Sequence, residues 1–432
     1  MSILTISSTN PNLSFILQKN PNTIREGGKP FSRDIRKGKV YGWYTNKENT
    51  EFRLWFKDSD TESSFANGVQ AEFEYLDITR YASPYLPLQI VQHALASAAK
   101  EQDPQDTAEF TTTVSTMIKI PSLHMAQQIA ATAPEGSSIE IIEDAVVSPI
   151  KITAPTVFQA LNLLQLLCVI MAIKDKDSYV QLDFASLQKF VRILNRSKAS
   201  YYPRYLLSSR AINTRDVFAK LVSELQGENM TLKFGDTRIQ RYDAIYPYLT
   251  RGTTLIDIGC GEMYYSFKKA PIYEQVYSVD CDEDLAEINQ AKIQKRNIEN
   301  IKYLAEKATP EWVESVRPIF ESADVLMTEV LEHMPIEDAD KLLRSVLSTD
   351  ARRVVVTVPN GLFNENYAMG DAAFRHDDHH FEPTFQDWCD YTVTVAQECG
   401  WDVSNMQAGD IVNGESVSTL TVFTPKKKEQ NV

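Results

Sequence analysis

The chain has few cysteines, and none of them has the spacing that binds zinc or builds a disulfide framework. Five cysteines occur in 432 residues, an odd number without a C-x-x-C pair. This usage excludes a small disulfide-rich secreted protein and is typical of a reducing compartment. The first residues, MSILTISSTNPNLS, also lack the basic start and the sustained apolar region of a signal peptide. We therefore expect a cytoplasmic protein.

Low-complexity tracts, internal repeats and long hydrophobic runs are also missing. The most apolar stretch, Thr153 to Ile173, is interrupted at helical spacing by Gln159, Asn162 and Gln165. A membrane span needs about 20 consecutive, predominantly apolar residues. The pattern therefore predicts a buried helix in place of a membrane span.

At 432 residues and 49.0 kDa, the chain is too long for one domain. We expect a mixed α/β domain over residues 1–150, a helical segment over 151–235 and a Rossmann-like α/β domain over 236–432. Glu228–Gly235 is the predicted linker, and Thr237–Leu249 is the predicted entry helix of the last domain.

Short apolar patterns define the expected elements of the first domain, because alternation indicates strands and a longer period indicates helices. The predicted strands are Ile3–Ile6, Val40–Trp43, Phe52–Phe56 and Glu72–Tyr75, and the predicted helices are Leu86–Ala98 and His124–Ala131.

Basic residues alternate with tyrosines in the helical region, residues 154–226. They are Lys189, Arg192, Arg196, Lys198, Arg204 and Arg210, among Tyr201, Tyr202 and Tyr205. Such a mixture can bind single-stranded RNA. Amphipathic helices with a solvated basic face have the same pattern, so both interpretations stay open.

Positive charge is scarce in the C-terminal half. Counting Lys and Arg against Asp and Glu, residues 241–432 sum to −15 and residues 1–240 to +1, which together give the net charge of −14. Nucleic acids owe most of their non-specific affinity to Lys and Arg. Either only the last nucleotides of a nucleic acid bind to this half, or the N-terminal half or a partner protein supplies the positive surface.

Four of the six histidines lie in two short segments that are rich in carboxylates, Thr328–Met334 (TEVLEHM) and Phe374–Thr384 (FRHDDHHFEPT). Glu329, Glu332 and His333 fall at i, i+3 and i+4, so one helical turn would point them toward one spot. One more imidazole would complete a metal site. Carboxylates and imidazoles without a thiolate suit Mn²⁺, Mg²⁺ or Co²⁺ better than a structural zinc. The alternative is a solvated helix start followed by a polar loop.

A glycine-rich turn precedes both segments, in Thr253–Glu262 (TTLIDIGCGE). The apolar run ending at Asp257 predicts a buried parallel strand, and Gly259 and Gly261 allow the backbone to approach a ligand closely. The next apolar run ends at Asp280, whose carboxylate could accept hydrogen bonds from both ribose hydroxyls of an adenosine cofactor. The D-x-G-x-G form, the second acid and the location favour S-adenosylmethionine over NAD. Asp257 would orient the turn and the methionine end of the cofactor, or else cap a helix.

Taken in order, the segments from Thr253 to Pro425 resemble the HEN family, which methylates the 2′-hydroxyl of the 3′-terminal nucleotide of small RNAs. The family patterns D-x-G-C-G-E, E-x-x-E-H, P-N and R-H-x-D-H-x-F-E-W correspond to Asp257–Glu262, Glu329–His333, Val358–Asn360 and Arg375–Pro383. The resemblance implies S-adenosylmethionine as the methyl donor. It assigns the metal ligands to Glu329, Glu332, His333 and His379.

The sequence departs from the family pattern at three places. Pro383 replaces the final Trp, and Met263 replaces the glycine that usually follows Glu262. Tyr303–Pro310 has no obvious counterpart. These departures affect the expected substrate wall and one edge of the cofactor turn, but they remove no ligand.

The chemistry of these groups indicates how methyl transfer would proceed. A ribose hydroxyl is a poor nucleophile near neutral pH, and a divalent ion bound to it lowers its pKa. Two vicinal hydroxyls could chelate one ion, which predicts a preference for RNA 3′ ends with free 2′ and 3′ hydroxyls. His376 is the candidate general base, with a ligand imidazole (His333 or His379) or water as alternatives. His380 is equally consistent with a structural role.

The N-terminal sequence, LTISSTNPNLSFILQKNP near its start, resembles the N-terminal half of the bacterial members of this family. By that resemblance, the chain works in an RNA-repair system with a polynucleotide kinase-phosphatase and an RNA ligase, and its N-terminal half binds the repair partner. We therefore expect a hetero-oligomer. Two other hypotheses stay open: a metal-dependent small-molecule O-methyltransferase acting on a catechol-like diol, and a scaffold subunit with secondary methyltransferase activity.

Overall fold

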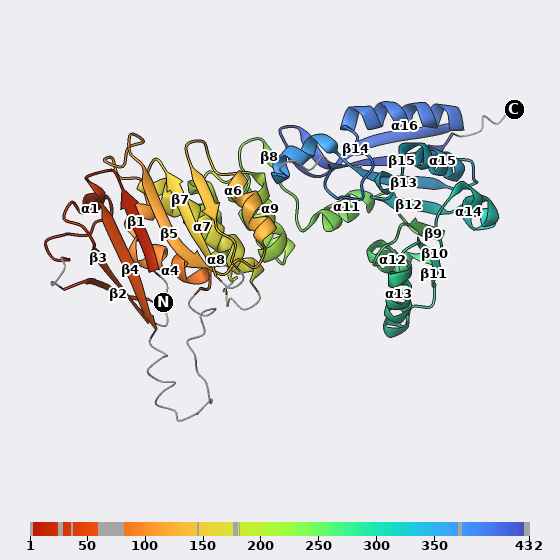
Figure 1. Cartoon of the computed structure of the whole chain (residues 1–432). Coiled ribbons are helices and arrows are strands. Elements are labelled where there is room, and N and C mark those ends of the chain that lie inside the picture. Colours follow the sequence, from red (N-terminus) through yellow and green to blue (C-terminus); the bar gives the residue numbers. More distant parts are fainter. Residues whose placement is uncertain are drawn as a thin grey trace, which may run out of the picture. The chain divides into compact units, whose positions relative to one another are not determined.

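The chain forms two compact units, Met1–Glu228 and Asn229–Val432, in a computed structural model (Figure 1). The structure describes residues 3–24, 29–35, 38–58, 82–144, 147–175, 180, 182–369 and 374–426. The predicted boundary at residue 150 falls inside a strand of the first unit. Residues 1–150 and the helices that follow them therefore belong to one compact unit, whereas the predicted boundary at 235 lies close to the observed division.

The first unit is built on a seven-stranded sheet with the order β2-β3-β4-β1-β5-β7-β6. Every neighbouring pair in this sheet is antiparallel. Its strands are β1 (Ile3–Ser8), β2 (Phe31–Ile35), β3 (Gly38–Tyr44), β4 (Glu51–Asp58), β5 (Thr112–Ile118), β6 (Ser138–Ile141) and β7 (Ser148–Ala154). The predicted strands within β1, β3 and β4 are confirmed, and Glu72–Tyr75 lies outside the described residues.

Four strands of this sheet, β2, β5, β6 and β7, were not predicted from the sequence. In β5 the buried positions alternate as expected, but two of them are Thr112 and Thr116. These threonines dilute the period-two apolar signal on which strand prediction depends.

Helices cover this sheet, and their bounds are α1 (Leu13–Ile16), α4 (Tyr85–Ala94), α5 (Ala96–Lys100), α6 (Leu123–Ala131), α7 (Val157–Lys174), α8 (Phe184–Arg196), α9 (Tyr201–Ala211) and α10 (Arg215–Leu225). The predicted helix Leu86–Ala98 is interrupted at Leu95, which separates the end of α4 at Ala94 from the start of α5 at Ala96. The helical prediction for residues 154–226 is confirmed by α7 to α10.

Helix α7 is long and apolar enough to cross a membrane by length and composition, but 78% of it is buried inside the unit. Its polar residues are satisfied within the core, since the Asn162 side chain donates to the carbonyl oxygens of Ala99 (3.1 Å) and Phe158 (2.8 Å). The buried helix predicted for this stretch is confirmed.

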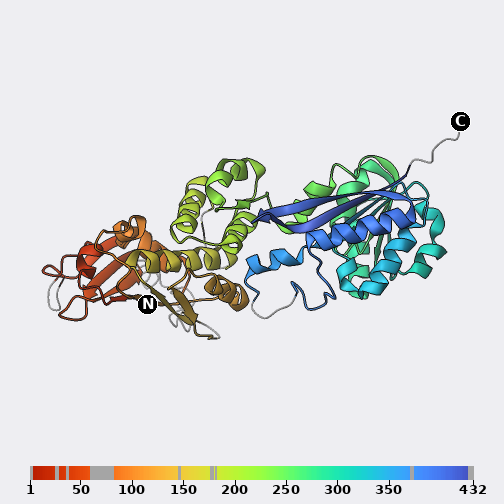
Figure 2. The ribbon, with the colours of Figure 1, turned by 90° about the horizontal axis from the view of Figure 1, so that it is seen from above.

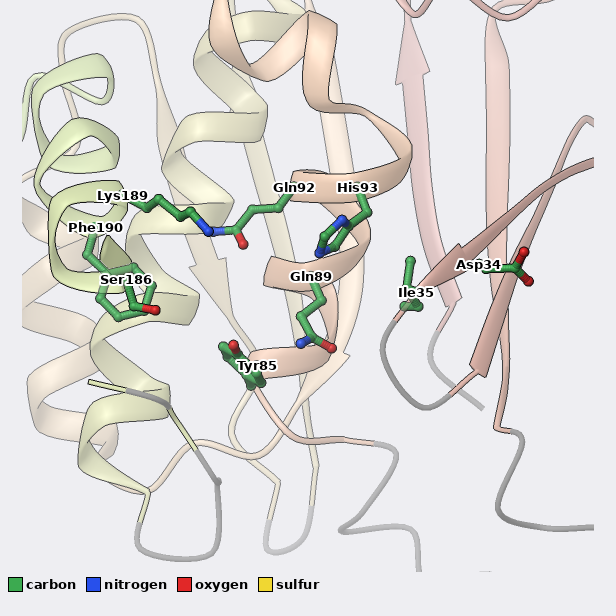
Figure 3. Close-up of a pocket in the computed structure, with 9 residues that line it drawn as sticks. All are labelled: Asp34, Ile35, Tyr85, Gln89, Gln92, His93, Ser186, Lys189 and Phe190. Carbon is green, nitrogen blue, oxygen red and sulfur yellow. The ribbon is translucent and has the colours of Figure 1, made fainter. Parts of the chain in front are cut away.

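Three of the side chains that suggested RNA binding in the helical region are part of the packing. Arg204 is buried and donates to the carbonyl oxygens of Ala199 (2.9 Å) and Leu225 (2.8 Å), and Tyr201 and Tyr202 are buried as well. Four of the six basic residues are instead exposed, namely Lys189, Arg192, Lys198 and Arg210. Lys189 lines a cavity of about 380 Å³ between β2, α4 and α8 (Figure 3).

The second unit contains an eight-stranded sheet with the order β11-β10-β9-β12-β13-β15-β14-β8. The first five strands in this order are parallel, and the last three are antiparallel additions. The strands are β8 (Met230–Thr231), β9 (Gly252–Ile258), β10 (Tyr273–Asp280), β11 (Ile301–Ala305), β12 (Asp324–Thr328), β13 (Arg353–Pro359), β14 (Trp401–Val412) and β15 (Glu415–Pro425).

The α-helices of this unit are α11 (Thr237–Ile245), α12 (Tyr264–Lys269), α13 (Glu283–Arg296), α14 (Pro310–Ser315), α15 (Ile336–Leu347) and α16 (Phe385–Cys399), and the 3₁₀ helices are η1 (Ala270–Ile272), η2 (Arg317–Phe320), η3 (Leu331–His333) and η4 (Gly361–Tyr367). Helix α16 packs along β14 and β15 (Figure 2). Entry helix α11 ends at Ile245, before the predicted end at Leu249.

The core strands explain why this unit adopts a doubly wound fold. Strands β12 and β13 are buried at nearly every position, as expected of parallel strands covered on both faces. The chain runs from β9 outward to β10 and β11 and then crosses back to β12, so the strand order reverses beside β9. Ligands of open α/β sheets bind at the carboxyl ends of the strands, where this reversal occurs. The predicted α/β fold class is confirmed.

Candidate active site

The loops that follow β9, β10, β12 and β13 meet at one edge of the second sheet. They enclose a cavity of about 860 Å³, whose lining includes Gly259, Gly261, Asp280, Glu329 and His333. The glycine-rich turn and the carboxylate and histidine segments thus border a common space.

The glycine turn after β9 needs glycine at its first position. Gly259 has a φ of 66°, and a Cβ there would lie 2.4 Å from Cγ2 of Val330. Both conditions exclude a larger side chain. Gly261 has a φ of 48° with open space where its Cβ would be, so only its backbone conformation favours glycine.

Met263 occupies the position at which the family usually has glycine. Its φ is 64° and its side chain is fully buried. The left-handed backbone accounts for the glycine of the family pattern. Here the cost of that conformation is offset by the burial of the methionine side chain in the core.

Asp257 lies behind the turn and does not line the cavity. It is fully buried, its Oδ2 accepts a 2.5 Å hydrogen bond from the hydroxyl of Ser266, and Ser266 in turn accepts one from Ser278 (2.8 Å). Burial raises the pKa of Asp257 to about 7. These contacts join the end of β9 to α12 and so hold the turn in place.

Asp280, at the end of β10, does line the cavity. Its Oδ2 accepts the N–H of Gly261 at 2.7 Å, and its Oδ1 accepts the N–H of Asp282 at 3.0 Å. A carboxylate has about four acceptor positions, so Asp280 can still accept hydrogen bonds from a ligand. It fixes the turn and faces the ligand space at the same time.

Glu332, His333 and His379 form the candidate metal cluster. One ligand atom from each residue lies within 4.8 Å of the others, and the rings of His333 and His379 are 4.6 Å apart. Both oxygens of Glu332 are buried without a hydrogen-bond partner among the described residues. Burial, together with the neighbouring Glu329 carboxylate, raises the pKa of Glu332 well above its usual range. A divalent cation would compensate this buried charge, so the donor set fits a metal ion.

Glu329 is positioned differently from the expectation of a single helical turn. Its φ is 53°, and only Leu331–His333 forms a short 3₁₀ helix. Its Oε2 pairs with the guanidinium of Arg241 at 3.1 Å, whereas its Oε1 is buried and has no partner among the described residues. The predicted helical turn is therefore wrong, and among the described residues the group of ligand atoms within 4.8 Å of one another contains Glu332, His333 and His379 but not Glu329.

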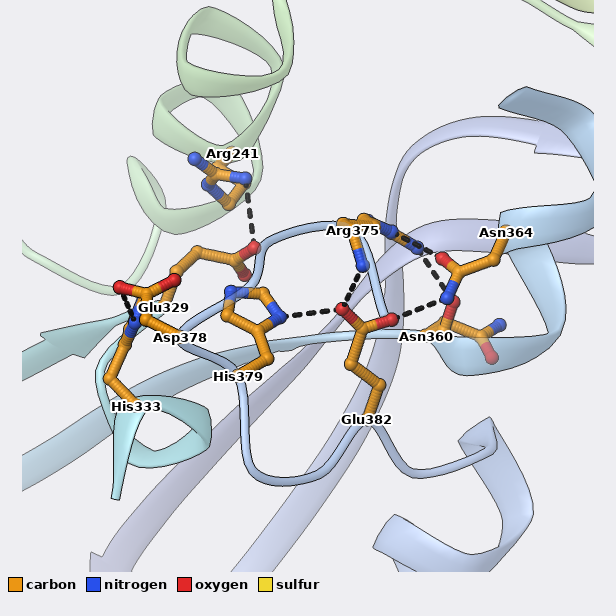
Figure 4. Close-up of polar contacts among 9 residues, drawn as sticks. All are labelled: Arg241, Glu329, His333, Asn360, Asn364, Arg375, Asp378, His379 and Glu382. Carbon is orange, nitrogen blue, oxygen red and sulfur yellow. Dashed lines mark hydrogen bonds and ion pairs between the residues drawn. The ribbon is translucent and has the colours of Figure 1, made fainter. Parts of the chain in front are cut away.

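His379 is held in place by a network that the sequence did not reveal (Figure 4). Its Nδ1 lies 2.5 Å from Oε1 of Glu382, and the same carboxylate accepts bonds from the N–H of Arg375 (2.8 Å) and the amide of Asn364 (2.5 Å). Burial lowers the pKa of His379 even though Glu382 opposes the change. A neutral imidazole with Nδ1 on a carboxylate presents Nε2 to a metal, as in many metalloenzymes.

The other histidines of the second segment surround the cluster. His376 is exposed, and its ring lies 5.1 Å from that of His379. His380 lines the cavity, and its backbone N–H donates to the carbonyl of Glu332 at 2.7 Å. His333 contacts Asp378 through Nδ1 at 2.9 Å. The hydrogen bond of His380 ties the two predicted segments together.

Arg241 and Glu382 are the site residues that sequence reasoning missed. Arg241 lies far from the carboxylate segments in the chain, on α11, and no local pattern marks it. Glu382 was part of the family pattern, but its role as a partner of His379 depends on the fold of the loop. No signal in the sequence alone could have identified either contact.

Comparison with known proteins agrees with this architecture. A curated relative, the small RNA 2′-O-methyltransferase of Caenorhabditis elegans, is 34% identical over 152 residues, which cover 30% of this chain and 34% of the relative. The chain thus matches about a third of the length of that relative. Chains in two solved structures, "Structure of the Pnkp1/Rnl/Hen1 RNA repair complex" and "Structure of Pnkp1/Rnl/Hen1 complex", are 23% identical to this chain. They cover 98% of it and 100% of themselves with TM-scores of 0.75 and 0.73, a similarity that shows the fold.

The N-terminal unit carries the family assignment. Residues 3–230 match the Hen1 N-terminal domain family along the whole described extent of the first unit. Because this match spans more than half of the chain, the protein belongs to the Hen1 N-terminal domain family.

Proposed function

We propose that this chain transfers the methyl group of S-adenosylmethionine to the 2′-hydroxyl of the 3′-terminal nucleotide of RNA in a metal-dependent reaction. One observation carries the proposal: the glycine turn and the carboxylate and histidine segments line a common cavity of about 860 Å³. A methyl donor on the turn would then lie beside a hydroxyl held at the cluster. The name of the curated relative points to the same reaction.

The cofactor would occupy the cavity at the carboxyl ends of β9 and β10. Gly259 and Gly261 let the backbone approach it, and Asp280 offers acceptor positions for its ribose hydroxyls. Asp257 would act indirectly, by holding the turn through Ser266. When bound, S-adenosylmethionine supplies the electrophilic methyl group.

Glu329, Glu332, His333 and His379 would hold Mn²⁺, Mg²⁺ or Co²⁺. The unpartnered oxygens of the two glutamates and the neutral His379 ring support this assignment. When bound, the ion lowers the pKa of a coordinated ribose hydroxyl. Arg241 would keep Glu329 in place through its other oxygen.

His376 is the proposed acceptor of the proton that leaves the 2′-hydroxyl. It is exposed, its ring lies 5.1 Å from that of His379, and it is not needed as a ligand. His333 and His379 would be occupied as ligands, which leaves His376 and His380 available to accept a proton, and of these His376 has its ring beside that of His379.

The N-terminal unit is the proposed binding site for the repair partners, a polynucleotide kinase-phosphatase and an RNA ligase, in a cytoplasmic hetero-oligomer. The family match over this unit and the similarity to a chain of a repair complex support this part of the proposal. Co-expression of the full chain with the kinase-phosphatase and ligase of the same source, followed by affinity purification and size-exclusion chromatography, tests it. Elution of the chain apart from both partners would contradict it.

The reaction is tested by measuring methyl transfer from labelled S-adenosylmethionine to short RNAs that differ only at the 3′ end. Transfer should occur with a free 2′,3′-diol and Mn²⁺, and it should be lost with a 2′-deoxy end, a 3′-phosphate or EDTA. Equal transfer to the 2′-deoxy RNA would show that another position is methylated. Transfer to a catechol but not to RNA would favour a small-molecule O-methyltransferase.

A further inference from the structure

Helices α11 and α12 of the second unit present a surface of basic and aromatic side chains, which we call the α11–α12 surface. It consists of Arg238, Tyr242, Tyr246, Tyr264 and Lys268. Arg238 and Lys268 are exposed, and Tyr246 is 59% exposed, one of the largest hydrophobic exposures in the described part of the unit. Packing of α11 against α12 does not require these three side chains to be exposed.

The contacts within this surface bring cations and rings together. The guanidinium of Arg238 lies 4.6 Å from the ring centroid of Tyr264, and Nζ of Lys268 lies 5.0 Å from that of Tyr242 and 5.2 Å from that of Tyr264. The ring of Tyr246 lies 5.9 Å from that of Tyr242. Cations beside aromatic faces are the groups with which proteins bind single-stranded nucleic acids, through phosphates and through stacked bases.

Charge sets this surface apart from the rest of its unit. Residues 229–270 contain six Lys and Arg against four Asp and Glu, whereas residues 271–432 contain fourteen against thirty. Two acidic residues border the surface, because Asp236 lies 3.7 Å from Arg238 and the exposed Asp243 interacts electrostatically with Tyr242 and Tyr264. The region around α11 and α12 is still the part of this unit to which a polyanion would be attracted.

The surface adjoins the candidate active site through α11. Arg241 lies three residues after Arg238, about 4.5 Å along the helix axis, and pairs with Glu329 at 3.1 Å. Figure 4 shows Arg241 reaching from α11 toward Glu329 and the cluster. A chain whose terminal ribose lies at the cluster could therefore continue over the α11–α12 surface.

The neighbouring residues of the same helices have structural roles, which makes the exposed ones distinct. Lys269 is fully buried and donates to the carbonyl of Leu249 at 2.9 Å, and Tyr265 is buried against Arg241. Lys and Arg are usually exposed, so Tyr246 is the more informative residue: its ring centroid lies 4.3 Å from Nζ of Lys269, yet the side chain remains 59% exposed. Arg238 and Lys268 add exposed positive charge beside it.

We propose that the α11–α12 surface binds the single-stranded RNA next to its 3′ end, with Arg238 and Lys268 on phosphates and Tyr246 stacked on a base. This inference rests on the proposed function, because it takes RNA as the substrate. It locates the positive surface that the acidic C-terminal half otherwise lacks. It also makes binding of the 3′ end a property of this unit, without a partner protein.

The test compares the full chain with the double variant Arg238→Glu/Lys268→Glu and with the control Lys302→Glu, an exposed lysine on the edge strand β11. Fluorescence anisotropy with a 5′-labelled single-stranded RNA measures affinity in the presence of Mn²⁺ and S-adenosylhomocysteine over a series of salt concentrations. The double variant should bind at least ten-fold more weakly, and the salt dependence, d log K/d log[salt], should become shallower by about 1.4, or about 0.7 for each lost phosphate contact. The control should match the wild type.

Steady-state methylation provides a second measurement. The double variant and Tyr246→Ala should raise KM for RNA with little change in kcat or in KM for S-adenosylmethionine, and thermal unfolding should stay at the wild-type temperature because these side chains are exposed. Unchanged RNA affinity in a chain that methylates RNA would overturn this inference and leave the proposed function intact. Absence of methylation by the wild type would instead contradict the function. Loss of binding to a repair protein with RNA affinity unchanged would assign the surface to protein binding and would also overturn the inference.

Discussion

Replacing Glu332 with Gln should remove the response of the protein to metal while leaving its fold intact. Glu332 is fully buried and both of its oxygens lack a hydrogen-bond partner among the described residues. Gln has nearly the same shape but no charge. Without metal, the variant should unfold at the wild-type temperature or above it, because an uncompensated buried carboxylate destabilises the folded state.

The size of the effect follows from linkage between binding and stability. An ion present at 100 times its Kd stabilises the folded protein by about 2.7 kcal/mol. For a unit of about 200 residues, each kcal/mol raises Tm by roughly 2–4 °C, so Mn²⁺ should raise the Tm of the second unit by about 5–11 °C. In Glu332→Gln, this shift and methyl transfer should both be lost.

Glu337→Gln is the matched control, because Glu337 is an exposed acid in the first turn of α15, close to Glu332 in the sequence. Differential scanning calorimetry with and without Mn²⁺ measures the shift for all three proteins. The control should keep the full Mn²⁺ shift. Its Tm should be somewhat lower both with and without Mn²⁺, because the substitution removes about 0.3–1 kcal/mol of helix-dipole stabilisation. A wild-type Mn²⁺ shift in Glu332→Gln, or near-normal turnover at saturating Mn²⁺, would refute the assignment of Glu332 as a ligand.

Three further predictions concern pH, the glycine turn and the first unit. Burial raises the pKa of Asp257 to about 7, above the ~3.9 of an unfolded Asp, so the folded state holds this proton more tightly. The free energy of unfolding, measured in urea, should therefore fall between about pH 4 and 7, by up to about 1.4 kcal/mol per pH unit. The variant Asp257→Asn should reduce that slope. Gly259→Ala should weaken S-adenosylmethionine binding at least ten-fold in isothermal titration calorimetry, because the new Cβ would meet a valine side chain. Gly261→Ala should cause a smaller loss of affinity, because its Cβ has open space. Equal losses of affinity would contradict this reasoning. Arg204→Ala should destabilise the first unit by about 3 kcal/mol or more in urea unfolding, because it leaves buried carbonyl groups unpaired, and the exposed Arg210→Ala should stay within about 0.5 kcal/mol of the wild type.

The second unit could be predicted well from the sequence because its signals are local. The buried run ending at Asp257 and the glycines after it specify a strand and a tight turn by themselves, and both are present. In the first unit, the sheet depends on pairing between distant segments. There the half-polar strand β5 carries too weak an apolar period to be identified alone.

The sequence named the three residues that the structure brings together, Glu332, His333 and His379, but not the geometry of the candidate metal site. The i, i+3, i+4 spacing predicted that Glu329, Glu332 and His333 share one helical turn. The backbone is instead left-handed at Glu329, and only Leu331–His333 forms a 3₁₀ helix. Residues that are adjacent in sequence can converge by more than one local structure. Arg241 and Glu382 complete the site from elsewhere in the fold, and contacts of this kind depend on tertiary packing that no sequence period encodes.

The central claim is that Glu332, His333 and His379, joined by Glu329, bind a cation beside the methyl donor. The most direct measurement is an anomalous difference map at the manganese edge, from crystals of the full chain grown with Mn²⁺ and S-adenosylhomocysteine. We expect one strong peak in contact with these four side chains, next to cofactor density at the turn of Gly259. A cofactor-bound structure with no peak at these residues, or with manganese bound only elsewhere, would contradict the account.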